Sequence, residues 1–455
     1  MHDRDGSRRT WLVLPAAFAL LFAACSSNAS PSGGGGGLSG ATVKIIATWT
    51  GDEQKNFLAM VKPWETQTGA KVSYTGAKDI NNILATGVAS GVLPDLAGLP
   101  GPGQMNEYAQ KGALKPLDNV IDLATYKNET AKVLVDLGTT SDGKIGGVFI
   151  KSAVKGLIWY SPSAHDYSAS PPKTWDELTS QATANKGSAQ AIWCLGIEDG
   201  AASGWSGTDW IEDIVLRQSG PDVYNKWWQG AVKFSDPKIK QGFTTFGDIV
   251  TNSFGGSTTV NATNFKVAGD PLFKTPPGCE LFHQASFITG LGAFKAKKAG
   301  TDYNFFPFPD IDPQYASAIE GAGDLFGMFH DTDAAKSLIK YLVTAPAQDI
   351  WVKAGGALSA NKNATSYPDD ISKRSAALLQ NAKIFVYDAS DQMPNQLQNA
   401  FLKGIVDYVK TPSSLDATLA SLDALQASSQ PQASAAAASP SAAAASPSAS
   451  ASPSP

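Results

Sequence analysis

Cysteine and histidine are scarce in this chain of 455 residues, which contains three cysteines and four histidines. Neither a CxxC nor an HExxH motif is present, so the residues that most often hold zinc lack the usual spacing. A complete P-loop, a GxSxG motif and a GxGxxG that opens a helix after a strand are missing as well. These absences predict no metal site and no nucleotide or other cofactor.

Long runs of one charge are also missing. The chain has 36 basic and 41 acidic residues and a net charge of −5, which argues against nucleic acid as a partner. The 43% of hydrophobic residues is typical of a globular protein, and no segment after residue 24 is long and apolar enough to span a membrane. The chain is longer than one hydrophobic core usually accommodates, so we expect two lobes.

Residues 1–24 have the features of a signal peptide. Arg4, Arg8 and Arg9 form a positive region, and residues 11–24 are an apolar stretch too short for a transmembrane helix. Residues 7–12 resemble a twin-arginine export signal. The alternative is that the two adjacent arginines only add charge to an ordinary signal.

The apolar stretch ends in a sequence similar to the bacterial lipobox. Residues 21–25 read LFAAC, although Phe22 stands where that motif usually has Leu, Val or Ile. The resemblance implies that Cys25 is lipidated and becomes the first residue of the mature protein. Residues 25–40 are rich in Ser, Asn, Gly and Pro, which predicts a flexible tether beyond the anchor. The expected location is the outer face of the cell membrane.

Residues 427–455 consist almost wholly of Ala, Ser, Pro and Gln. Pro431, Pro440, Pro447 and Pro453 interrupt every alanine run before a stable helix length is reached. We therefore predict a disordered tail, either simply solvated or an O-glycosylated stalk.

Two cysteines, Cys194 and Cys279, remain after Cys25. In an exported protein two cysteines most simply form one disulfide bond. The alternative is a pair of buried free thiols.

The N-terminal third alternates between strand and helix patterns. Strands are expected at 42–49, 71–74 and 94–97, with helices at 53–68 and 79–88. This alternation indicates a parallel α/β sheet, in which ligands bind at the carboxyl ends of the strands. Further along, we expect strands at 156–160, 281–287 and 303–307, and helices from 174, at 209–218, 224–228, 333–344 and 399–410.

Four segments resemble one protein family. They are the LPD at 93–95 with YAQKGALKPLD at 108–118, GLIWY at 156–160, PKTWDEL at 172–178, and AAK to YL at 334–342 with APAQ at 345–348 and GG at 355–356. In this order they are similar to the extracellular solute-binding proteins of family 1, the maltose-binding-protein type of sugar binders of ABC importers. The resemblance spans residues 43–409.

A narrower resemblance points to the binders of α-glucoside importers. The segments that carry it are GWSGTDWIEDI at 204–214, HQASFI at 283–288, FPFP at 306–309 and GAGD at 321–324. It implies an α-glucoside or related oligosaccharide as the ligand.

The family resemblance implies an α/β, two-lobed periplasmic-binding-protein fold with a ligand cleft between the lobes. The first lobe would comprise 41–150 and 324–360, and the second 151–323 and 361–426. Hinge-crossing segments would fall near 150–154 and 320–324, where Gly321 and Gly323 suit a change of backbone dihedrals. The implied partners are a small carbohydrate and the permease subunits of the importer, and we expect a monomer.

Sugar binding needs aromatic faces for the C–H patches of a pyranose and polar groups for its hydroxyls. Trp205, Asp209 and Trp210 offer both kinds. We expect Trp205 to be an exposed platform in a loop. Asp209 stands near an expected helix start, so it either binds ligand or caps the helix, and Trp210 either binds ligand or belongs to the core.

Further candidates come from the resemblance and from strand ends. Phe287 is expected to stack on the sugar, with Gln284 as its polar neighbour, or else to pack in the core. Trp49 ends the first strand at the expected cleft. Asp324 and Lys151 fall at the two crossings, where Asp324 is expected to accept from a hydroxyl.

Two other classes of protein also bind sugars: surface lectins or adhesins, and glycosidases. A surface lectin or adhesin would bind sugar without lobe closure. A glycosidase would need two carboxyl groups facing one bond, one of them with a raised pKa, and no local catalytic signature indicates this. The prediction is therefore a receptor and not an enzyme.

Overall fold

One six-stranded sheet organises the N-terminal part of the chain. The computed structural model describes residues 37–429. The strands are β1 (Thr42–Ala47), β2 (Lys71–Gly76), β3 (Leu96–Leu99), β4 (Gly147–Val154), β9 (Ala318–Met328) and β10 (Ile384–Tyr387). They run in the order β10-β9-β3-β1-β2, and β4 pairs with β9. Strands β1, β2 and β3 are parallel, whereas β9 is antiparallel to both β3 and β4.

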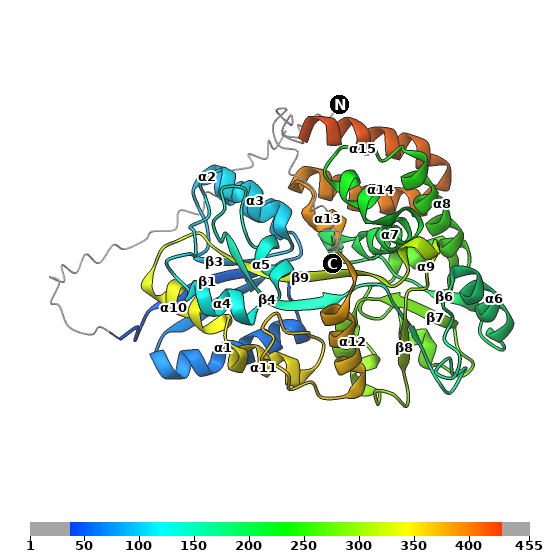
Figure 1. The fold of residues 1–455 in the computed structure, drawn as a ribbon, viewed down its shortest axis with the longest axis horizontal. Helices are drawn as coiled ribbons and strands as arrows, with labels where there is room; N and C mark the ends of the chain where they lie inside the picture. Colours follow the sequence, from blue (N-terminus) through cyan, green and yellow to red (C-terminus); the bar gives the residue numbers. More distant parts are fainter. Residues whose placement is uncertain (1–36, 430–455) are drawn as a thin grey trace, which may run out of the picture. The chain divides into compact units, whose positions relative to one another are not determined.

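Helices cover both faces of this sheet (Figure 1). Along β1, Val43, Ile45 and Ala47 join one core cluster while Ile46 joins another, because successive side chains of a strand point to opposite faces. The first cluster includes residues of α1 (Asp52–Thr68), α10 (Asp333–Leu342) and α11 (Ala345–Ala354). The second includes residues of α2 (Ile80–Ser90), α3 (Pro102–Gln110) and α5 (Lys132–Leu137), and α4 (Leu123–Glu129) precedes α5.

A second, four-stranded sheet has the order β6-β7-β5-β8. Its strands are β5 (Leu157–Tyr160), β6 (Ala191–Cys194), β7 (Cys279–Gln284) and β8 (Asn304–Pro307). The helices that follow or pack near it are α6 (Trp175–Asn185), α7 (Trp205–Trp228), α8 (Pro237–Thr251), α9 (Gly256–Ala262), α14 (Asn395–Lys410) and α15 (Leu415–Ser429). Two sheets, each with its own helices, make the fold two-lobed and α/β.

The chain leaves the first sheet for the second between β4 and β5, at Lys155 and Gly156. It returns along β9, whose first residues pair with β10 and whose last residues pair with β3. Helices α12 (Asp370–Asn381) and α13 (Ala389–Gln392) flank β10. The lobe boundaries given in the sequence analysis stay a prediction.

Three local expectations were wrong. Helix α7 begins at Trp205 rather than at Asp209, after Gly204 with a φ of 110°. A Cβ at Gly204 would lie 2.1 Å from the carbonyl oxygen of Leu402, so the helix start depends on this glycine. Phe287 lies in a 3-10 turn after β7, not in the strand. Residues 427–429, expected in the disordered tail, complete α15.

Cys194 of β6 and Cys279 of β7 are joined by a disulfide bond, with their Cα atoms 5.4 Å apart. The two strands are parallel neighbours, so the bond links the edge strand β6 to the interior strand beside it. Among residues 37–429, no helix has the length and hydropathy needed to cross a bilayer. The predicted signal peptide, Cys25, most of the tether and nearly all of the tail lie outside the described residues.

Candidate functional site

A pocket of about 170 Å³ lies at the carboxyl ends of the parallel strands of the first sheet. Trp49 follows β1, Lys78 follows β2 and Pro100 follows β3, and all three line it. This is the edge at which open α/β sheets bind ligands. The opposite side is lined by Trp205 and Asp209 of α7, so both lobes contribute to the pocket.

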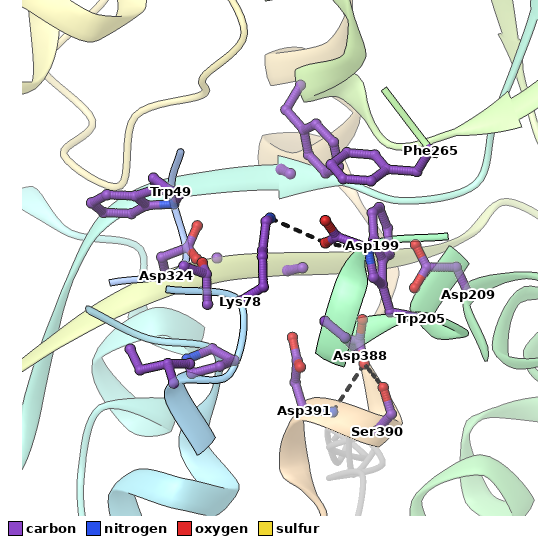
Figure 2. A pocket seen from close by; sticks show the side chains of 18 of the residues that line it. Trp49, Lys78, Asp199, Trp205, Asp209, Phe265, Asp324, Asp388, Ser390 and Asp391 are labelled. Carbon is purple, nitrogen blue, oxygen red and sulfur yellow. Dashed lines mark hydrogen bonds and ion pairs between the residues drawn. The ribbon is translucent and has the colours of Figure 1, made fainter. Parts of the chain in front are cut away.

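Three aromatic side chains form one wall of the pocket. The rings of Trp205 and Phe265 are 4.8 Å apart at an interplanar angle of 71°, and those of Trp205 and Phe287 are 6.0 Å apart. All three residues line the pocket, and Figure 2 shows Phe265 beside Trp205. Such a wall can cover the apolar faces of a ring-shaped ligand.

Lys155 forms the most deeply buried ion pairs of the pocket. Its Nζ lies 2.7 Å from Asp209 Oδ2 and 2.9 Å from Asp388 Oδ2, and 5.2 Å from the centre of the Trp205 ring. Burial opposes the charged form of Lys155, but the two carboxylates raise its pKa well above the ordinary value. Burial raises the pKa of Asp209 to about 7, although Lys155 opposes the shift.

Lys151, on β4, forms a second group of buried ion pairs. Its Nζ lies 2.9 Å from Glu53 Oε1 and 3.4 Å from Asp324 Oδ2, and 4.9 Å from the centre of the Trp351 ring and 5.5 Å from that of Trp49. Burial favours the neutral form of Glu53, but Lys151 and nearby lysines hold its pKa below the ordinary value. Burial raises the pKa of Asp324, with Lys151 opposing.

A third ion pair lines the same pocket beside the aromatic wall. Lys78 Nζ is 3.1 Å from Asp199 Oδ2, and the indole N–H of Trp205 donates to the same carboxylate over 3.1 Å (Figure 2). Burial raises the pKa of Asp199, and Lys78 opposes this. The pair fixes the orientation of the Trp205 ring.

Amide and carboxyl groups close the pocket toward α13 and α14. Asn81 donates to the side-chain oxygen of Gln398 over 3.2 Å, and Gln398 donates to Asp391 Oδ1 over 2.8 Å. Asp391 and Ser390 line the pocket beside them (Figure 2). These groups supply both donors and acceptors to a ligand rich in hydroxyls.

The structure brings together most of the candidates named from the sequence. Those that line the pocket are Trp49, Lys151, Trp205, Asp209, Phe287 and Asp324. Trp49 is 2% exposed and packs against Phe57, Phe326 and Trp351, so it belongs to the core as well. Trp205 is half-buried at the helix start, not an exposed loop platform.

Trp210 and Gln284 do not line this pocket. One position beyond Asp209 on α7 the side chain points to another side of the helix, and Trp210 lies in the core, 4.9 Å from the Trp193 ring and 4.2 Å from that of His283. Gln284 is buried, and its side-chain oxygen accepts from the N–H of Ala285. Asp209 lies inside α7 and does not cap it.

Several pocket residues were missed: Glu53, Lys78, Lys155, Asp199, Phe265, Asp388 and Asp391. A signal existed for Lys155, because Lys151, Ala153 and Lys155 follow the period of two that places side chains on one face of a strand. Asp388 directly follows a short apolar strand, β10. Phe265 lies in an irregular segment between α9 and β7, where no periodicity indicates it.

Comparisons with known proteins agree with this geometry. Residues 59–380 match the sequence family described as bacterial extracellular solute-binding protein, which confirms the family resemblance found in the sequence. The osmoprotective compounds-binding protein GgtB of Synechocystis sp. is 35% identical over 81% of this chain and 88% of its own.

Two further relatives share the fold or the sequence. The alpha-glucosides-binding periplasmic protein AglE of Rhizobium meliloti is 32% identical over 83% of this chain and 86% of its own. The crystal structure of the bacterial solute receptor AcbH, which prefers β-D-galactopyranose, superimposes with a TM-score of 0.74 at 18% identity, covering 86% of this chain and all of AcbH.

The raised pKa of Asp209 generates a pH-dependent prediction. Its folded-state pKa of about 7 exceeds the ordinary value of 3.8, so the unfolded chain loses this proton first and stability declines as the pH rises between about 4 and 7. Asp209→Asn removes this titration. We expect the Tm of the variant, minus that of the wild type, to increase as the pH rises through this range.

The measurement is a set of melting curves across the pH range. A Tm difference for Asp209→Asn that stays flat or falls as the pH rises would contradict a raised pKa at this carboxyl.

Proposed function

We propose that this chain, which belongs to the bacterial extracellular solute-binding proteins, is the carbohydrate-binding subunit of an ABC importer. The observation that carries the proposal is the wall of Trp205, Phe265 and Phe287 facing lysine–carboxylate pairs in one pocket. Aromatic faces bind the C–H patches of a sugar, and polar groups bind its hydroxyls.

The charges of the pocket favour a neutral ligand. Lys78, Lys151 and Lys155 each lie within 3.1 Å of a carboxylate, so none of them is left to bind an anion. Lys155 and Lys78 also lie over the rings of Trp205 and Phe265. A cationic ligand would need these same positions to make cation–π contacts with the rings. A polyhydroxylated molecule needs neither kind of charge.

The narrower proposal is an α-glucoside or a related glycoside of small size. A relative that covers most of this chain is described as binding alpha-glucosides, and another as binding osmoprotective compounds. The cavity of about 170 Å³ is smaller than the 300–1,000 Å³ of typical drug-sized ligand sites. This size favours a ligand of one or two sugar rings.

Features of the pocket argue against a glycosidase and against a lectin. Asp209 has the raised pKa that a glycosidase acid needs, but its carboxylate already accepts from Lys155 over 2.7 Å. A lectin would not need a pocket built from two lobes. The chain is therefore proposed to be a receptor without catalytic activity that acts as a monomer and delivers its ligand to permease subunits.

The proposal includes a lipid anchor at the outer face of the cell membrane. It rests on the lipobox-like LFAAC at residues 21–25 and the polar tether after it. Acyl groups on Cys25 would keep the receptor beside its permease.

The first prediction concerns ligand binding. A screen of mono-, di- and oligosaccharides by thermal shift should find an α-linked sugar that raises the Tm of the chain, because a ligand of the folded state alone stabilises it. Trp205→Ala should weaken the affinity for that sugar by about five- to 150-fold, since a lost aromatic platform costs on the order of 1–3 kcal/mol.

Trp175→Ala is the matched control. Trp175 is also half-buried and also the first residue of a helix, but it stacks on Phe308 and lies outside the pocket. Affinity should survive in this variant. A Tm that responds to amino acids or peptides and to no sugar would overturn the carbohydrate assignment while leaving the family intact.

Lobe closure is tested by small-angle X-ray scattering. Because residues of both lobes line the pocket, a bound ligand should draw the lobes together and reduce the radius of gyration. The measurement compares the chain with and without saturating ligand, and the control adds a sugar that gives no thermal shift. Unchanged dimensions at saturation would favour the lectin reading.

The anchor is tested at Cys25. Cys25→Ser removes the thiol that would be acylated, so the receptor should move from the membrane fraction to the medium or the soluble exported fraction. Cys194→Ser, which leaves the lipobox-like sequence intact, should stay with the membrane. Equal distribution of Cys25→Ser and the wild type would reject lipidation at this residue.

A further inference from the structure

Behind the pocket lies a buried cluster of three carboxylates. Glu212 of α7, Glu320 of β9 and Asp388 at the start of α13 are at most 2% exposed. One oxygen from each lies within 4.8 Å of those of the other two. The three residues come from segments far apart in the sequence, so the fold and not a local turn brings them together.

Glu320 is the unusual member of the cluster. Neither of its carboxylate oxygens has a hydrogen-bond partner, although both are buried. A buried polar group without a partner is costly, and a buried carboxylate must be paired, protonated or bound to a cation. By contrast, Glu212 accepts from the N–H of Ala389 over 2.8 Å, and Asp388 accepts from the N–H of Asp391 over 3.0 Å.

The positive charges nearby are paired with carboxylates other than Glu320. Lys155 pairs with one member of the cluster, Asp388, and with Asp209. The guanidinium of Arg217 binds Asp213 and the carbonyl oxygens of residues 308 and 318, and His283 contacts the other oxygen of Asp213. Among the described residues no lysine or arginine forms an ion pair with Glu320, and neither of its carboxylate oxygens accepts a hydrogen bond.

We propose that Glu212, Glu320 and Asp388 bind one calcium ion behind the ligand pocket. Oxygen ligands lie 2.3–2.6 Å from Ca²⁺, so two of them can be up to about 5 Å apart across the ion, and the separation within the cluster satisfies this limit. Mg²⁺ demands near-ideal octahedral geometry and gives up its waters reluctantly, whereas Ca²⁺ accepts irregular sets of oxygens. The hydroxyl of Tyr224, 3.4 Å from Glu212 Oε2, is an additional neutral oxygen at the site.

The position of the site gives the ion an entry path and a structural role. Asp388 lines the pocket, so an ion can approach from the cleft. Once bound, it would tie α7, β9 and α13 together directly beneath the Lys155 ion pairs. The inference does not depend on which sugar the pocket takes.

The test is a calorimetric titration of the purified full chain, freed of divalent ions by a chelator, with calcium chloride alone. We expect one ion per chain with a dissociation constant below about 1 mM, and a rise in Tm of at least about 2 °C near saturation. Magnesium should bind at least about tenfold more weakly. Absence of binding at about 5 mM calcium would overturn the proposal and leave Glu320 protonated.

Glu320→Gln assigns the ion to the cluster. This variant keeps the shape of the side chain and removes an unpaired carboxylate, so it should fold as well as the wild type and lose the calcium response. Glu280→Gln is the control, because Glu280 is also a buried glutamate but accepts from Tyr167 far from the cluster. Calcium binding retained in Glu320→Gln, or lost in Glu280→Gln, would reject this site; should Glu320→Gln fail to fold, Glu212→Gln takes its place with the same expected loss.

Discussion

The buried ammonium of Lys155 is the interaction on which the site depends. Lys155 stands where the chain leaves β4 for the second sheet, and its Nζ bridges Asp209 of α7 and Asp388 at the start of α13. The backbone N–H of Lys155 also donates to the backbone carbonyl oxygen of Glu320. Removing one partner of a buried ion pair leaves an uncompensated charge and is strongly destabilising. Lys155 also lies over the ring of Trp205. It therefore connects the aromatic wall to the two carboxylates.

Lys151 forms the corresponding buried ion pairs in the first lobe. Lys151 lies within β4 and Lys155 directly follows the last residue of this strand, and both side chains line the pocket. Through Glu53 and Asp324, Lys151 connects α1 to β9, and its ammonium faces the rings of Trp351 and Phe287. Strand β4 and the residue that directly follows it thus carry the two cations, and each cation pairs with carboxylates from distant segments.

Sequence reasoning reached the α/β class, the two lobes and the edge of the sheet where the pocket lies, because alternation of strand and helix and the carboxyl-end rule are local or topological. It found Trp205 and Asp209 because an aromatic and a carboxylate four residues apart suggested sugar binding. It could not separate Asp209 from Trp210, since the helix start was misplaced and the face of α7 that meets the pocket depends on packing against Trp193 and His283. Ion pairs such as Lys78–Asp199 join loops of different lobes, and no sequence pattern encodes them.

We expect the selectivity of this pocket for its ligand to depend on the pairing of its lysines with carboxylates, not on the net charge of the pocket. Each lysine that lines the pocket is paired with a carboxylate. The hydrogen-bond donors and acceptors of the pocket are therefore oriented before a ligand binds. A pre-organised site loses less side-chain entropy on binding than a flexible one. The same pairing explains why Glu320 stands out. Both oxygens of the buried Glu320 lack a hydrogen-bond partner, so this carboxylate requires either a proton or a cation. One oxygen each of Glu212 and Asp388 lies within 4.8 Å of it, a separation that two oxygen ligands of one calcium ion can have.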